Sequence, residues 1–284
     1  MPVRPGPRPT VSAPELAHEL VEPEGGGAED LRWTYFLHGI FGAGRNWRSM
    51  ARRWVDAGPA RAGVLADLRL HGDSTGFEPP HTIEACGGDV EDLFAATGRR
   101  PFGLLGHSFG GKVALQVAAG APDGLSVVWI VDSTPEVREP EGDAVRMLGT
   151  LRAEPGPFGS RGEAEAAIRR HGFPAFVARW MTTNLVDEDG AQVWRFDLDG
   201  LAALLEDFFR ADLWPVVEDP PSGVELHFLR ASESGVLPEA ACERIEAAGR
   251  DTGRVHLHRV EGGHWLHVAA PDEVLAILDA TTPD

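Results

Sequence analysis

A serine between glycines is the residue of this sequence with the clearest chemical role. Ser108 lies in residues 106–111, which read Gly-His-Ser-Phe-Gly-Gly and match the pattern G-x-S-x-G. An apolar run, Phe102–Leu105, precedes this stretch, and a stretch typical of a helix, Lys112–Ala119, follows it. The order strand, turn, helix predicts a nucleophile elbow, a sharp turn that exposes the serine hydroxyl for attack on a carbonyl carbon.

The predicted turn is too tight for side chains on both sides of the serine. We expect Gly106 and Gly110 to be required because a Cβ atom at either position would collide with the backbone. The strained turn would point the Ser108 hydroxyl out of the sheet. It would then lie above the start of the next helix, where developing negative charge is favoured.

A serine hydroxyl needs a base within hydrogen-bond reach and a third group that orients the base. His264 follows the last predicted strand, residues 255–260, and is the predicted base. Asp132 ends the strand after the elbow helix and is the preferred acid, because it stands at the same edge of the sheet. Glu233, after the next strand along the chain, stays open as the alternative acid.

Two backbone N–H groups are expected to bind the oxyanion that forms on the substrate. One belongs to Phe109, directly after the serine. The other comes from residues 38–42, with Ile40 as the first choice and Phe41 as the second, while His38 is expected to brace this turn. The candidate residues of the substrate pocket are Phe41, His107, Trp180 and Trp265.

A charged stretch, Asp67–Ser74, could be taken for a metal site. We interpret it as a structural turn in which Asp67 and Arg69 hold the loops around the elbow. His256 and His258 alternate along a predicted strand and are interpreted as residues of the sheet surface. The sequence has no H-E-x-x-H pattern, no carboxylate–histidine pair at metal spacing and no phosphate-binding glycine loop, so it predicts neither a metal nor a cofactor.

The composition excludes several classes of partner. The chain has 284 residues, of which 43% are hydrophobic, which suffices for one large core. Its 26 basic and 44 acidic side chains give a net charge of −18, which argues against nucleic acid and membrane as partners. Cys86 and Cys242 match no metal-binding pair, so we expect free thiols. The proline-rich start has no apolar segment, so we expect a cytoplasmic location. We also expect a monomer or homodimer with a small-molecule substrate.

Apolar runs alternate with helical patterns along much of the chain, which predicts a mostly parallel sheet with helices on both faces. The predicted strands are residues 15–21, 32–37, 62–67, 102–105, 125–131, 224–230 and 255–260. The alternation breaks at residue 135. We therefore expect a core of residues 15–134 and 222–284 and a disordered lead-in at 1–14. Residues 135–221, which show no clear strand, are expected to form a helical lid inserted into the core.

On these residues the chain resembles the α/β-hydrolase superfamily over nearly its whole length. Within it, the chain is similar to small bacterial esterases and to the abhydrolase domain-containing protein 11 type. The matching stretches are residues 38–42, 46–47, 67–74, 106–113, 131–135, 183–185, 194–198 and 263–267. The resemblance implies the α/β-hydrolase fold, with a lid after the strand that follows the elbow, and an esterase or thioesterase without a cofactor. It also implies that Asp132 is the acid, although Ala231-Ser232-Glu233 replaces a glycine-rich turn and keeps Glu233 as the alternative.

The predicted function is that of a serine hydrolase. It would cleave carboxylic esters or thioesters of small apolar acyl groups through Ser108, Asp132, His264 and an acyl-enzyme. The aromatic residues of the lid predict a preference for short to medium acyl chains. Alternative functions on the same fold are C–C bond hydrolysis, lyase or perhydrolase (haloperoxidase) chemistry, and ligand binding without catalysis.

Overall fold

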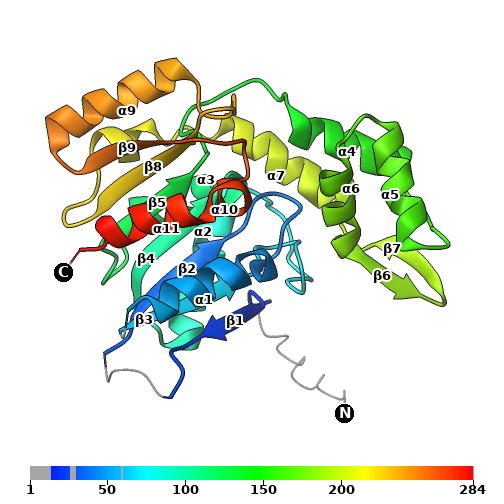
Figure 1. The fold of residues 1–284 in the computed structure, drawn as a ribbon, viewed down its shortest axis with the longest axis horizontal. Helices are drawn as coiled ribbons and strands as arrows, with labels where there is room; N and C mark the ends of the chain where they lie inside the picture. The colour runs from blue at the N-terminus through cyan, green and yellow to red at the C-terminus, as the bar shows by residue number, and fades with distance from the viewer. Residues whose placement is uncertain (1–13, 26–29, 59, 284) are drawn as a thin grey trace, which may run out of the picture.

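A central sheet organises the protein (Figure 1). The computed structural model describes residues 14–25, 30–58 and 60–283, so the predicted lead-in at 1–14 lies almost wholly outside the described residues. Within that part of the chain, seven strands form one sheet in the order β1-β3-β2-β4-β5-β8-β9. The strands are β1 (His18–Val21), β2 (Arg32–Leu37), β3 (Arg61–Ala66), β4 (Pro101–His107), β5 (Val127–Val131), β8 (Glu225–Ala231) and β9 (Val255–Val260).

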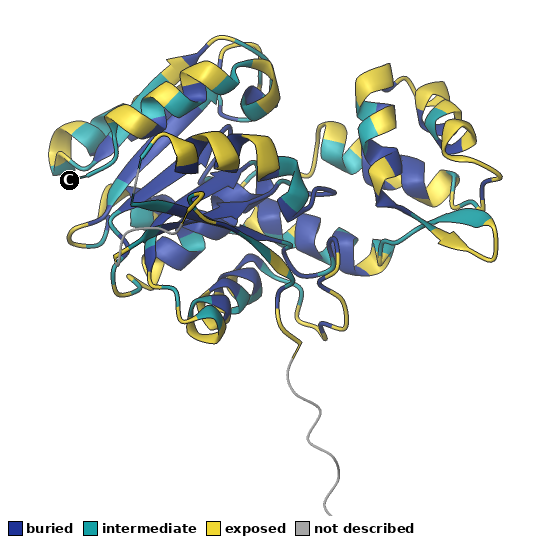
Figure 2. Ribbon diagram, turned by 60° about the horizontal axis from the view of Figure 1, so that its bottom comes forward, coloured by how far each residue is buried: buried dark blue, intermediate teal, exposed yellow. Residues whose placement is uncertain are grey.

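All neighbouring strands of this sheet run parallel except β1, which pairs antiparallel with β3. The central strands are apolar because both faces of the sheet are covered, and all of β5 is buried. Figure 2 shows the central sheet mostly in the colour of buried residues. Parallel strands place all their carboxyl ends at one edge. The loops that follow β2, β4, β5 and β9 therefore meet there, which is where this type of sheet binds ligands.

Helices cover the two faces of the sheet in separate layers. On one face, α1 and α11 pack over a core that contains Trp54, Trp129 and Leu278. On the other face, α2, α3 and α9 pack over a second, larger core. The core helices are η1 (Gly44–Trp47), α1 (Arg48–Asp56), α2 (Ile83–Thr97), α3 (Phe109–Ala119), α9 (Glu239–Thr252), α10 (Leu266–Ala269) and α11 (Pro271–Ala280).

A mostly helical insertion separates β5 from β8 and extends to one side of the sheet (Figure 1). Its elements are α4 (Asp143–Ala153), α5 (Arg161–Arg170), α6 (Ala175–Met181), η2 (Thr182–Asn184), β6 (Leu185–Glu188), β7 (Ala191–Trp194), α7 (Leu198–Arg210) and α8 (Trp214–Glu218). The expectation that this segment lacks strands is wrong, because β6 and β7 form a hairpin. Asp189 and Gly190, both at positive φ, make its turn, and an Asp-Gly pair is a strong hairpin signal.

No helix in the described part of the chain combines the length and the apolar character needed to cross a bilayer.

Candidate active site

Ser108 occupies the turn between β4 and α3, and its backbone is strained, with φ 52° and ψ −114°. Its N–H donates to the carbonyl of Val131 at 2.9 Å, which fixes the turn against the neighbouring strand. A Cβ atom at Gly106 would overlap the carbonyl of Gly110, and one at Gly110 would overlap the carbonyl of Leu37. The requirement for glycine at both positions is therefore confirmed. The reason is that the backbones of β4, the start of α3 and the end of β2 approach one another closely at this turn.

The start of α3 presents unpaired amides beside the serine. The carbonyl of Ser108 accepts hydrogen bonds from the N–H groups of Gly111, at 2.9 Å, and Lys112, at 3.3 Å, which begins the helix. The amide of Phe109 precedes these two donors, in the first turn, where helix N–H groups have no intrahelical acceptor. An oxygen that gains negative charge near this amide would also meet the positive end of the helix dipole.

His264 and Asp132 are directly paired. The Nδ1–H of His264 donates to Oδ2 of Asp132 at 2.6 Å. Asp132 is fully buried and has a φ of 44°, and its other oxygen accepts the N–H of Ala231 at 3.2 Å. The side chain of Glu233 is exposed, and its backbone N–H donates to the carbonyl of Gly262. Of the two candidate acids, the one after β5 makes the contact with the histidine.

Two further histidines support the loop that carries His264. The Nε2–H of His107 donates to the backbone carbonyl of His264 at 2.9 Å, and the two rings lie 4.6 Å apart. The ring of His267 packs on His107 at 4.7 Å and on Trp47 at 4.6 Å. Burial lowers the pKa of His267 to about 4 and holds the pKa of His107 well below its usual value, so both rings are neutral at pH 7. His107, predicted to line the pocket, is only 5% exposed and supports the His264 loop through its hydrogen bond to the loop backbone.

The turn after β2 contains the second candidate oxyanion donor. The N–H of Phe41 donates to Nε2 of His71 at 3.1 Å, whereas the amide of Ile40 has no acceptor among the described residues. The Ile40 amide thus remains available for a substrate oxygen. His38 braces the turn by accepting the N–H of Leu68 at 3.0 Å. Burial lowers the pKa of His38 to about 4 and that of His71 to about 3, so both rings can accept these bonds.

The charged stretch after β3 is a structural turn, as interpreted from the sequence. Asp67 accepts the N–H of Gly44 at 2.6 Å and that of Asp73 at 2.8 Å. Arg69 makes a bidentate pair with Asp89 of α2, with N–O distances of 2.5 and 2.8 Å. Asp67 and Arg69 are therefore engaged in hydrogen bonds and an ion pair that hold neighbouring loops together.

The insertion contacts the turn after β2. The side-chain amide of Asn184 donates to the carbonyl of Phe41 at 2.9 Å. The ring of Phe196 packs edge-on against Phe41, with centroids 5.6 Å apart, and Arg45 donates to the carbonyl of Thr183 at 2.8 Å. Thr183, Asn184 and Phe196 belong to the stretches 183–185 and 194–198, so these stretches attach the insertion to the turn after β2.

An aromatic cluster connects α6 of the insertion to the His264 loop. Trp265 contacts Trp180 at a centroid distance of 4.7 Å and Phe176 at 5.4 Å. Phe176 was not among the predicted pocket residues and is 63% exposed. Two of the predicted pocket residues, Trp180 and Trp265, therefore lie together directly beside the candidate base.

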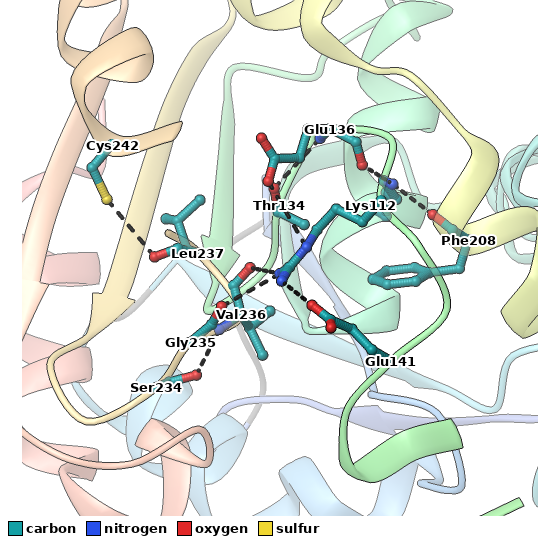
Figure 3. Close-up of polar contacts among 11 residues, drawn as sticks. Lys112, Thr134, Glu136, Glu141, Phe208, Ser234, Gly235, Val236, Leu237 and Cys242 are labelled. Atoms are coloured by element: carbon teal, nitrogen blue, oxygen red, sulfur yellow. Dashed lines mark hydrogen bonds and ion pairs between the residues drawn. The ribbon is translucent and has the colours of Figure 1, made fainter. Parts of the chain in front are cut away.

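Lys112, the single lysine of the sequence, joins both ends of the insertion to α3. Its buried ammonium group donates to the carbonyl of Glu136 at 2.9 Å, just after β5, and to that of Phe208 in α7 at 2.6 Å (Figure 3). Burial lowers the pKa of Lys112 to about 8. This role of Lys112 is not predicted from the sequence. A single lysine in an arginine-rich chain could nevertheless have indicated a position with a special role.

Comparisons with known proteins assign the chain to a family. Residues 35–277 match the model of the Alpha/beta hydrolase family. The chain belongs to this family. The mouse protein named sn-1-specific diacylglycerol lipase ABHD11 is 30% identical over 273 residues, which cover 94% of this α/β hydrolase and 84% of the mouse protein. Lipase LipV of Mycobacterium tuberculosis is 27% identical over 247 residues, covering 85% of this chain and 90% of LipV.

Solved structures support the same fold. A marine microorganism esterase superimposes on this α/β hydrolase with a TM-score of 0.80 and 22% sequence identity, over 94% of this chain and 99% of the esterase. The predicted fold class, a mostly parallel sheet between helical layers, is thereby confirmed.

Proposed function

We propose that this α/β hydrolase cleaves carboxylic esters by acyl transfer, with Ser108 as nucleophile, His264 as base and Asp132 as orienting acid. The pairing of His264 with Asp132 is the single observation that carries the proposal. A buried carboxylate that accepts the Nδ1–H of an imidazole leaves Nε2 of the neutral ring free to take a proton. The same pairing stabilises the imidazolium that forms when the proton arrives.

The reaction then proceeds in two halves. His264 takes the hydroxyl proton of Ser108 while the serine oxygen attacks the ester carbonyl, and the oxyanion is bound by the amides of Phe109 and Ile40. The intermediate collapses as His264 returns the proton to the leaving alcohol, which leaves an acyl-enzyme. A water molecule, deprotonated by the same histidine, attacks the acyl carbon and releases the carboxylic acid and the free serine.

The relatives support an ester as the substrate. The mouse relative is named a diacylglycerol lipase and the mycobacterial one a lipase. Apolar walls for an acyl chain would come from Phe41, Trp180 and Trp265, because these aromatic side chains adjoin the candidate oxyanion turn and the His264 loop. We propose short to medium acyl chains as the preferred substrates.

A fluorophosphonate probe tests whether the serine is activated. We expect covalent labelling of the wild-type protein at Ser108 and none of Ser108→Ala, because only an activated serine attacks the phosphorus. A series of p-nitrophenyl esters of increasing chain length then tests the pocket, and a maximum at short to medium chains is expected. An unlabelled wild-type protein would favour ligand binding without catalysis. Labelling without hydrolysis of any ester would favour another chemistry on the same residues.

A further inference from the structure

Three histidines and one glutamate gather at the end of the sheet opposite the candidate active site. Glu225 and His227 belong to β8, and His256 and His258 belong to the edge strand β9. His227 pairs in register with both Trp129 and His256, so these side chains share the face covered by α1 and α11. The two histidines of β9 give no metal-site signal by themselves, because their neighbours on β8 are identified only by the strand register.

The potential ligand atoms are close together. Nε2 of His227 lies 3.2 Å from Oε2 of Glu225, and Nε2 of His256 lies 3.8 Å from the same oxygen. One nitrogen or oxygen from each of these three residues lies within 4.8 Å of the other two. Ligands 2.0–2.1 Å from a tetrahedral zinc ion stand about 3.3 Å from one another, which is close to the spacing of these atoms. The rings of His227 and His256 are stacked, with centroids 4.6 Å apart and an interplanar angle of 13°, so at least one ring must rotate for both nitrogens to face one ion.

One of these atoms lacks a partner. Nε2 of His256 is buried and has no hydrogen-bond partner among the described residues. Burying a ring nitrogen without a partner is unfavourable, and such atoms are rare in folded proteins. An ion placed between His256, His227 and Glu225 would satisfy this nitrogen and neutralise the carboxylate at the same time.

His258 has the position of an outer-shell partner. Its Nε2 lies 3.1 Å from Nδ1 of His227, so it can accept the Nδ1–H of His227 when the other ring nitrogen binds an ion. Histidine ligands of metals nearly always donate their second N–H in this way, which orients the ring.

We propose that Glu225, His227 and His256 bind one zinc ion. Two imidazole nitrogens and one carboxylate oxygen are a ligand set that suits zinc, and the side chains of Glu225 and His256 are 44% and 39% exposed, so water can fill the fourth position. Calcium and magnesium prefer sites made of oxygen atoms alone. The ion would link the edge strand β9 to β8 at their amino ends, whereas Ser108 and His264 lie at the carboxyl ends of the strands, so its role would be structural.

Calorimetric titration of chelator-treated protein with Zn²⁺ tests the site. We expect one ion per chain in the wild type and the loss of this binding in Glu225→Gln and in His256→Gln. His258→Leu should weaken binding about 10- to 100-fold, because it removes an outer-shell acceptor. His18→Gln changes an exposed histidine on the opposite edge strand, β1, and should bind zinc as the wild type does.

The histidines of the candidate active site are the competing location for zinc. His264→Ala should retain the stoichiometric binding and the zinc-induced rise in the unfolding temperature, whereas His256→Gln should lose both. Ester hydrolysis by Glu225→Gln and His256→Gln without zinc should equal that of the wild type. The proposal is overturned if the wild type binds no stoichiometric zinc. It is equally overturned if the binding survives in both Glu225→Gln and His256→Gln, or if His264→Ala alone abolishes it.

Discussion

The side-chain amide of Asn184 donates to the backbone carbonyl of Phe41 at 2.9 Å, across 143 residues of sequence. Asn184 belongs to the insertion, and Phe41 belongs to the turn that carries the free amide of Ile40. The insertion thus takes part in positioning a candidate oxyanion donor.

Replacing Asn184 should therefore impair catalysis more than substrate binding. Asn184→Ala leaves the buried carbonyl of Phe41 without a donor, and an unpaired group of this kind costs about 1–3 kcal/mol. If the turn relaxes to satisfy that carbonyl, the Ile40 amide moves away and kcat falls about 10-fold, with a smaller change in KM. Steady-state ester hydrolysis measures both constants. The control is Thr183→Ala, whose exposed hydroxyl bonds only to the carbonyl of Trp180. An equal loss in both variants would refute the positioning role of Asn184.

The identity of the acid can be tested by a pair of substitutions. Asp132→Asn removes the charge that holds the His264 tautomer, and kcat should fall by about 10⁴-fold. Glu233→Gln alters an exposed side chain and should leave kcat unchanged. Both variants should remain folded by circular dichroism, because the replacements preserve shape. A larger kcat loss in Glu233→Gln would reverse the assignment.

Lys112 should stabilise the attachment of the insertion. Lys112→Met keeps the chain length but leaves the carbonyls of Glu136 and Phe208 unpaired, and hydrogen bonds to a charged group contribute about 1.5–3 kcal/mol each before desolvation offsets part of this. We expect a lower unfolding temperature and faster proteolysis between residues 135 and 221. The matched control is Arg169→Met on the exposed side of α5. Identical cleavage rates in Lys112→Met and wild type would rule out this attachment role.

Acid should destabilise the protein through its buried neutral histidines. The folded pKa of His38 is about 4, below the usual 6.5, so between these values the unfolded chain binds a proton that the folded protein does not. Stability is therefore lost as the pH falls from 6.5 to 4, by about 3 kcal/mol for a shift of this size. Urea unfolding at several pH values should show this decline, with a shallower slope in His38→Gln. The same slope as in the exposed-site variant His18→Gln would exclude His38 as a source.

The sequence predicted the fold and the catalytic candidates because their signals are local. Ser108, Asp132 and His264 each follow a predicted strand, and parallel strands necessarily bring their carboxyl ends together. Other features depend on contacts between distant segments. The sequence favours Asp132 over Glu233, but which carboxylate contacts His264 depends on the direction of each side chain, which strand patterns do not contain.

Three structural features are hard to predict from short stretches of the sequence, because they depend on distant contacts or on a turn within a mostly helical segment. The hairpin of β6 and β7 rests on an Asp-Gly turn within a segment whose helical patterns dominate. Lys112 acquires its role from two carbonyls that lie 24 and 96 residues away. The group of Glu225, His227 and His256 arises from the register of two strands separated by α9.

The rate of ester hydrolysis by Ser108→Ala, compared with that of the wild type, is the decisive test of Ser108 as the nucleophile. With both proteins shown to be folded, we predict that kcat for a p-nitrophenyl ester falls by about 10⁴-fold or more in the variant, because no acyl-enzyme can form. Equal rates in the two proteins would show that Ser108 is not the nucleophile.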